Sequence, residues 1–248
     1  DGNATDTSDN VAQTVEGSVG NGDGTKMGIG GGFDNDLSGD ARYDVTMQRY
    51  TIAGGSNAAA IGDMQYAGGY DVYHGTTSIR WILAGGYSPN TGDSSSLMED
   101  IHYMTWASEG NSADLSNLTA SRTHGNATVS SESVMVFGSS TSEPIATGSE
   151  SRTHQMDWIN PTTNTDAAAF GDDVGDDGSD DSDSATRSSG GNVQDGIRGE
   201  FWSGDPVSSN ADFATDSIRY ITIASASDST DAGNDLIASG PGRLAHTG

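Results

Sequence analysis

The chain has 248 residues, with 36 acidic against 10 basic residues and a formal net charge of −26. It contains no cysteine, which excludes disulfides and any catalytic or metal-binding thiol. No run of about 18 apolar residues occurs, so no membrane-spanning segment is predicted. The charge opposes binding to nucleic acid and to anionic lipid, because both depend on clustered Lys and Arg.

The acidity is of an unusual kind. The acids are 29 Asp and 7 Glu, whereas the bases are nine Arg and a single lysine, Lys26. Extreme halophiles tolerate such a charge because molar salt shortens the Debye length to ~3 Å and screens the self-repulsion. The composition resembles that of halophilic proteins; the alternative is an acidic extracellular protein from ordinary brine or sea water.

A repeat of 54 residues runs through the chain. Apolar runs that end in small residues place Ile29, Leu83 and Phe137 at intervals of 54, and Phe201 follows 64 residues later. The ten extra residues fit an insertion in the acidic stretch at 172–183. Two further landmarks keep the period, namely Thr51-Ile52-Ala53 with Thr105-Trp106-Ala107, and the residues Asn3, Asn57 and Asn111.

Each repeat is expected to form short strands, since β-branched and aromatic residues alternate between clusters of Gly, Asn, Asp and Ser. The four tryptophans are expected to pack between sheets. They are Trp81, Trp106, Trp158 and Trp202. A period of this length with several strands predicts a β-propeller of four-stranded blades. Glycine pairs such as Gly85-Gly86 are expected in crowded innermost strands.

In chain order, residues 1–12 are expected to form the outer strand of a closing blade. Four blades follow at about 13–65, 66–120, 121–174 and 175–238, and residues 239–248 form a tail. All belong to one domain, 1–248. A five-bladed ring with a reduced closing blade is favoured slightly over a four-bladed ring, and a neighbouring subunit is a further source of the missing strands.

The sequence resembles kelch repeats, and in particular kelch-like repeat proteins of tailed viruses from marine and saline hosts. The resemblance rests on the segments Ile29-Gly30-Gly31-Gly32-Phe33, Ala84-Gly85-Gly86-Tyr87, Tyr220-Ile221-Thr222-Ile223-Ala224, Gly2-Asn3-Ala4-Thr5-Asp6 and Leu118-Thr119-Ala120-Ser121-Arg122. It covers nearly the whole chain, although Gly138-Ser139-Ser140 and Trp202-Ser203-Gly204 lack the glycine pair. The resemblance implies a kelch-like propeller on the exterior of a virion.

One segment is a candidate calcium site. Asp34, Asp36, Ser38 and Asp40 place oxygen ligands at alternate positions with a glycine at the sixth, as in the beginning of an EF-hand loop. The bidentate acid of the twelfth position is missing, since that residue is Val45. The alternative is a polar loop at a blade edge without an ion, and no cofactor is expected to be required.

No catalytic constellation is found, and the protein is predicted not to be an enzyme. The five histidines are expected to be solvated loop residues rather than metal ligands; they are His74, His102, His124, His154 and His246. The run of Asp from 172 to 183 is expected to form a long, solvated loop.

These features predict a non-enzymatic structural protein on the virion exterior, outside the cell. It would serve as a capsid decoration or turret, or as a tail-associated propeller that binds the host surface. Expected partners are other capsid or tail proteins and a host surface glycan or protein, with no nucleic acid and no membrane insertion, and several copies per particle. The alternative is a secreted or cell-surface adhesion propeller of a halophilic cell.

Overall fold

The computed structural model describes residues 19–32, 44–52, 57–65, 72–86, 97–122, 128–138, 140–141, 152–153, 156–171, 191–202, 217–227 and 230–235. These residues form strands and turns, and none of them lies in a helix, so the described part holds no helix that could cross a membrane. The expected all-β fold is therefore confirmed. The predicted calcium loop lies outside the described residues.

The strands form four antiparallel sheets of four strands each, and within each sheet the strands follow one another in chain order. In sheet 3, a separate pair of strands is inserted in the chain between the second and the third strand. Sheet 1 holds β1 (Val19–Gly22), β2 (Lys26–Gly30), β3 (Thr46–Thr51) and β4 (Ala59–Asp63). Sheet 2 holds β5 (Tyr73–Thr76), β6 (Arg80–Ala84), β7 (Asp100–Thr105) and β8 (Ala113–Asn117). Sheet 3 holds β9 (Thr128–Ser130), β10 (Met135–Phe137), β13 (Met156–Ile159) and β14 (Ala168–Gly171). Sheet 4 holds β15 (Gly191–Gln194), β16 (Arg198–Trp202), β17 (Ser217–Thr222) and β18 (Thr230–Asp235). The insertion is the pair β11 (Ser140–Thr141) and β12 (Arg152–Thr153).

The strands keep the period of the sequence. Each of β5 to β8 begins 54 residues after its counterpart among β1 to β4. Strand β16 begins 118 residues after β6, which is two periods and ten residues. Sheet 3 ends at Gly171 and sheet 4 begins at Gly191, so the connection between these two sheets holds the extra residues.

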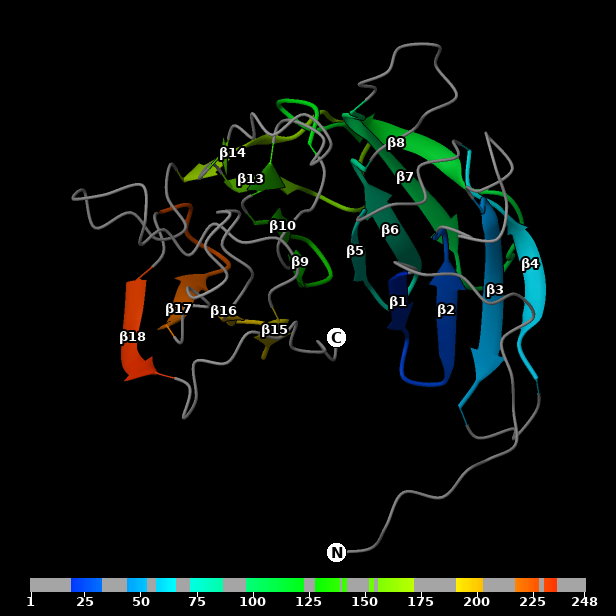
Figure 1. Ribbon diagram of the computed structural model, residues 1–248, viewed down its shortest axis with the longest axis horizontal. Coiled ribbons are helices and arrows are strands. Elements are labelled where there is room, and N and C mark those ends of the chain that lie inside the picture. Colours follow the sequence, from blue (N-terminus) through cyan, green and yellow to red (C-terminus); the bar gives the residue numbers. More distant parts are fainter. Residues whose placement is uncertain are drawn as a thin grey trace, which may run out of the picture.

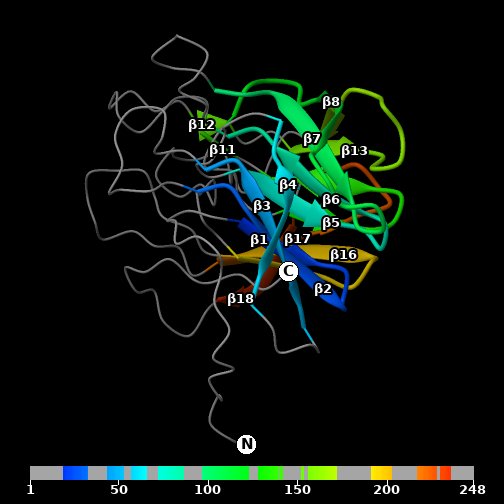
Figure 2. The same cartoon turned by 90° about the vertical axis from the view of Figure 1, so that its right-hand side faces the viewer.

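Successive sheets are neighbours in space. In Figure 1 they follow an arc from sheet 1 on the right, through sheets 2 and 3 at the top, to sheet 4 at the lower left. Figure 2 views the same arc from the sheet 1 end. The first strands contact one another in the order β1, β5, β9 and β15. Each sheet lies inside one of the four units expected from the repeat.

The first hairpin of every sheet is closed by a side chain at the same position of its turn. An oxygen of that side chain accepts a hydrogen bond from the backbone N–H three residues later, over 2.7 to 3.1 Å. Such local bonds define the turn and satisfy a backbone donor. The four accepting residues are Asp23, Thr77, Ser131 and Asp195.

The hairpin bonds also act on the ionisation of Asp23. Its burial raises the pKa, but hydrogen bonds from the backbone N–H groups of Lys26 and Thr25 outweigh burial and lower the pKa below its usual value. The carboxylate therefore stays charged in the turn down to lower pH than in the unfolded chain.

The sequence was expected to place the glycine pair Gly85-Gly86 in an innermost strand, and this expectation is wrong. The pair directly follows β6, the second strand of its sheet. Gly85 has a φ of 61° and Gly86 a φ of 102°, which residues with a side chain rarely adopt. A Cβ on Gly85 would also stand 2.7 Å from the carbonyl oxygen of Arg122. The pair is needed for a left-handed turn and a close approach of two backbones.

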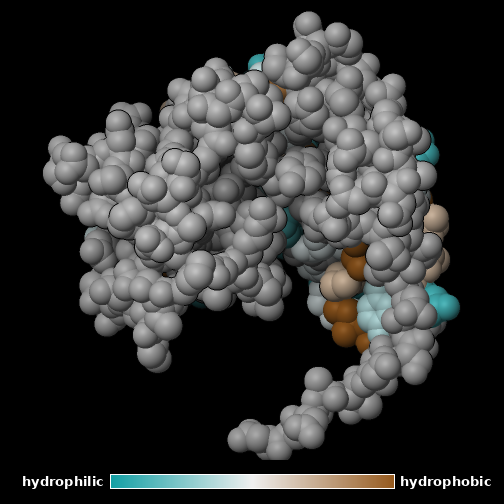
Figure 3. Space-filling model, viewed as in Figure 1, coloured by the Kyte–Doolittle hydropathy of each residue, from teal (hydrophilic) through white to brown (hydrophobic). Residues whose placement is uncertain are grey.

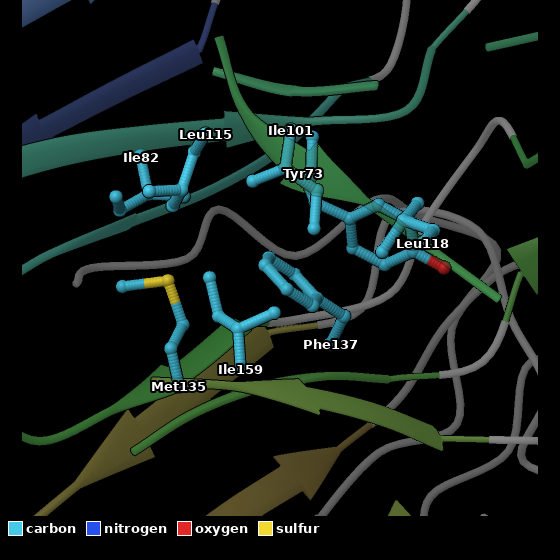
Figure 4. Packing of buried hydrophobic residues seen from close by; sticks show 9 residues of the cluster. Tyr73, Ile82, Ile101, Leu115, Leu118, Met135, Phe137 and Ile159 are labelled. Atoms are coloured by element: carbon cyan, nitrogen blue, oxygen red, sulfur yellow. The ribbon is translucent and has the colours of Figure 1, made fainter. Parts of the chain in front are cut away.

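Among the described residues, the largest apolar cluster fills the junction of sheets 2 and 3. Figure 4 shows side chains of sheet 2 facing Met135, Phe137 and Ile159 of sheet 3. The rings of Tyr73 and Phe137 meet edge to face at a centroid distance of 5.6 Å, and the Tyr73 hydroxyl donates to the carbonyl of Gly138 over 2.9 Å. This junction combines apolar burial with a satisfied polar group.

Candidate functional site

The aromatic stack, the ion pairs and the cation–π contact of this site lie at the junctions between neighbouring sheets. Between sheets 1 and 2, Trp81 and Trp106 stack at a centroid distance of 5.9 Å with planes 9° apart. Both are at most 3% exposed. A Cβ on Gly28 would stand 2.7 Å from the Trp81 ring, so this strand position needs glycine to admit the indole. The expected packing of tryptophan between sheets is confirmed for these two residues.

The other two tryptophans lie nearer the end of the chain. Trp158 of β13 is partly buried against the cluster of Val136, Met156, Phe170, Ile221 and Ile223 between sheets 3 and 4. The backbone of Trp202 ends β16, and its side chain lies outside the described part of the molecule.

Charged side chains bridge the edge of the junction between sheets 1 and 2. Lys26 Nζ donates to the carbonyl of Trp106 over 3.0 Å and pairs with Glu109 Oε1 at 3.1 Å. Arg49 Nη1 pairs with the same carboxylate oxygen at 2.8 Å. These side chains are about a quarter to a third exposed, so water and salt weaken the pairs.

The landmark around Asn111 has a structural role in the same junction. Asn111 Oδ1 accepts a hydrogen bond from Asp63 N over 3.0 Å, and Ser112 N donates to the Asp63 carbonyl over 2.9 Å. The turn therefore binds the backbone of the outermost strand of the preceding sheet. The next junction repeats the arrangement, with Asp166 and Ala167 on the backbone of Asn117.

A buried ion pair lies between sheets 2 and 3. Arg122 Nη2 stands 3.2 Å from Asp157 Oδ1, and both side chains are at most 1% exposed. Thr119 completes the group, since its N–H and its hydroxyl both donate to the Asp157 carboxylate at 2.7 to 2.9 Å. The charged partner and the two further donors satisfy the buried carboxylate oxygens, as a buried charge requires. The group joins the end of β8 to β13 and does not lie open to a ligand.

A second arginine crosses the same junction. The Arg80 guanidinium lies 4.0 Å from the centroid of the Tyr103 ring and donates through Nη1 to the carbonyl of Pro161 over 2.7 Å. Cation–π stacking fixes the guanidinium while its donor reaches the next sheet.

Two of the five histidines are described, and they contradict the expectation of solvated loop residues. His74 lies in β5 and is half-buried, and His102 lies in β7 and is 5% exposed. Burial lowers the pKa of His102, whereas the charges of Asp100 and Asp114 oppose this effect. His102 is therefore held neutral at neutral pH. His124, His154 and His246 lie outside the described residues.

The predicted cation ligands Asp34, Asp36, Ser38 and Asp40 also lie outside the described residues, as does the acidic run at 172–183. Within the described ranges, no group of three or more His, Asp or Glu side chains is placed to hold a metal ion. Asp44 and Asp157 are buried, whereas many of the other described acids lie at the surface; the exposed ones include Asp63, Glu99, Asp114, Glu132, Asp166 and Asp195.

Comparison with known proteins bears on the fold alone. No protein-family model matches the chain, and no curated protein matches it in sequence. A solved structure titled "Structure of YjhT" is similar, with a TM-score of 0.63 at 11% sequence identity. The match covers 91% of this chain and 68% of that chain. At this identity the likeness concerns the fold alone.

Proposed function

We propose that the protein is a kelch-like β-propeller that acts as a non-enzymatic structural protein on the exterior of a tailed virus particle. It would decorate the capsid or form part of the tail apparatus that contacts the host surface. The observation that carries this proposal is the succession of four sheets with one register, whose first strands adjoin one another. Blades around a central channel require this arrangement.

Two further features support the setting. Charged side chains pair across the sheet junctions, at a partly exposed edge for Lys26 with Glu109 and in the interior for Arg122 with Asp157, which suits a rigid scaffold. Many of the remaining described acids are exposed, and a net charge of −26 favours solubility. Loops on such a scaffold can vary without altering the packed sheets. A bound calcium ion at Asp34–Asp40 belongs to the proposal but is not needed for it.

The test is to count copies of the protein in particles banded in salt gradients, by quantitative mass spectrometry against the major capsid protein. Many copies per particle would support a capsid decoration, and a few would support a tail component. Absence from purified particles, with the protein recovered on washed cells or in the particle-free medium, would overturn the virion proposal. That result would favour a secreted or cell-surface adhesion module.

A further inference from the structure

Sheets 1 and 4 lie at the two ends of the arc. Each has one face that is equivalent to a face through which sheets 2 and 3 pack against a neighbour. We call the face of a sheet that points toward the preceding sheet its leading face, and the opposite one its trailing face. At the junction of sheets 1 and 2, the trailing face of sheet 1 presents Gly28, Gly30 and Met47, which pack against Trp81 of the leading face of sheet 2. Every junction in the arc joins a trailing face to a leading face.

The leading face of sheet 1 repeats the residues of a buried face. Its apolar side chains stand 54 residues before their counterparts in sheet 2; they are Met27, Ile29, Tyr50 and Ile52, matching Trp81, Leu83, Met104 and Trp106. The counterparts are at most 3% exposed, whereas Met27 is 36% and Ile52 is 52% exposed. In Figure 3 brown, hydrophobic residues lie open to solvent at this end of the molecule.

The trailing face of sheet 4 repeats the other half of a junction. Arg198 and Tyr220 stand in the register of Arg80 and Tyr103 of sheet 2. The Arg198 guanidinium lies 4.8 Å from the centroid of the Tyr220 ring, as Arg80 lies over Tyr103. Arg198 is exposed and Tyr220 is half-buried.

In sheets 1 and 2 the residue at the position of Arg80 is basic. In both sheets it donates a hydrogen bond across the junction to the sheet that follows. Lys26 donates to the carbonyl of Trp106 in sheet 2, and Arg80 donates to the carbonyl of Pro161 in sheet 3. Sheet 3 has Val134 at this position. Arg198 continues the series in sheet 4, and the carbonyl in the register of Trp106 on sheet 1 is that of Ile52.

We propose that the trailing face of sheet 4 in one copy of the chain packs on the leading face of sheet 1 in a second copy. The contact covers Met27 and Ile52, and Arg198 donates to the carbonyl of Ile52. In Figure 1 the two faces lie at opposite ends of the arc of a single copy. A contact between two different faces is head-to-tail, so it builds closed rings or growing chains of copies.

The experiment measures mass by sedimentation velocity and light scattering on the full chain over a range of protein concentrations. Molar salt is kept throughout, because the charge of each copy otherwise repels the next. The wild type should associate with increasing concentration. Ile52→Asp and Arg198→Glu should each raise the dissociation constant at least about tenfold, a change that corresponds to ~1.4 kcal/mol.

The matched control is Ile79→Asp, the same change at a residue with almost the same exposure, 54% against 52%, in the β5–β6 turn of sheet 2. It should associate like the wild type. Circular dichroism checks that each variant is folded.

Mixing the two interface variants gives the sharpest result. Ile52→Asp keeps an intact sheet 4 face and Arg198→Glu keeps an intact sheet 1 face. At concentrations where the wild type associates, each variant alone should stay largely monomeric, whereas the mixture should form a dimer and nothing larger. A wild type that remains monomeric at all concentrations would overturn the proposal, and so would a mixture that fails to associate or an Ile79→Asp variant that dissociates equally.

Discussion

Sheets 1 and 2 are built on the same register yet differ in how much of them is buried. Sheet 2 packs on both faces, with Trp81 against sheet 1 and Ile82 against sheet 3, and both side chains are 0% exposed. Sheet 1 packs on its trailing face alone among the described sheets, so Met27 remains 36% exposed at the position of Trp81.

The comparison shows that the strand pattern sets which side chains share a face, whereas the neighbours in the array decide whether that face is buried. Trp81 and Met27 are both apolar residues on the same face at the same register position. Only the presence of a preceding sheet distinguishes their environments. The energetic cost of truncating each residue should therefore differ, and the predictions below test that difference.

The largest effect is expected at Trp81. Replacing it with Ala removes an indole that packs on Gly28 and Trp106, and should lower the free energy of unfolding by about 3–5 kcal/mol. The matched change Met27→Ala should cost about 1 kcal/mol or less, because that side chain is already partly exposed. Denaturant unfolding at one salt concentration, on dilute and monomeric protein, compares the two. Equal costs would show that both leading faces are covered within one copy.

The next effect compares the ion pairs of two junctions. Asp157→Asn leaves the buried charge of Arg122 without its carboxylate and should lower the free energy of unfolding by about 3 kcal/mol. Glu109→Gln, at the partly exposed junction of sheets 1 and 2, should cost about 1 kcal/mol or less. Raising the salt concentration should shrink the Glu109 effect and leave the Asp157 effect nearly unchanged. The opposite salt dependence would contradict the burial of the pair.

A smaller difference in stability is expected between substitutions at two glycines with positive φ. The comparison separates backbone strain from steric conflict. Gly85→Ala places a Cβ 2.7 Å from the Arg122 carbonyl at a φ of 61°, and should cost about 2 kcal/mol or more. Gly24→Ala, at a φ of 90° with no atom within 4 Å of the added Cβ, should cost about 1 kcal/mol from strain alone. Thermal unfolding of both variants provides the measurement. Equal costs would mean that the chain moves away from Gly85 without resistance.

The smallest effect concerns pH. Burial depresses the pKa of His102, so between its folded and unfolded pKa the unfolded chain binds more protons than the folded one. Stability should therefore be complete above the unfolded value near 6.5 and fall as the pH is lowered through the folded pKa. His102→Gln introduces the residue that sheet 1 has at this register position, Gln48, which is 2% exposed. This variant should reduce the change of the unfolding free energy with pH between pH 7 and pH 5. An unchanged pH dependence would exclude His102 as its cause.

The sequence predicted the class and the order of the fold because its landmarks lie in the parts that repeat. The period made Ile29 and Leu83 equivalent, and both lie in the second strand of their sheet, although the sequence had assigned the glycine-pair runs to innermost strands. The all-β class followed from the strands between Gly and Asp clusters. The tryptophans at 81 and 106 were correctly expected to pack between sheets. These features are local or periodic, so a single sequence carries them.

Other features depended on contacts that no periodic pattern records. The role of Asp157 was not foreseen, because its partner Arg122 precedes it by 35 residues and belongs to another sheet. His102 was misjudged because it lies beside Leu83 on the face of sheet 2 that packs toward sheet 1. The turn acceptors Asp23, Thr77, Ser131 and Asp195 do follow the period, at spacings of 54, 54 and 64. A search for any Asp, Ser or Thr at that spacing, instead of one residue type, would have found them.

The extra residues between Gly171 and Gly191 have a consequence for engineering the chain. Sheet 4 keeps its register with sheet 3 although its connection is longer than the others, and Ile221 and Ile223 still pack against Val136. Packing between faces, and not the length of the covalent link, therefore sets the position of the next sheet. A tag or a small folded domain inserted into this connection should leave the scaffold intact, which makes it the natural place to graft a foreign sequence for display.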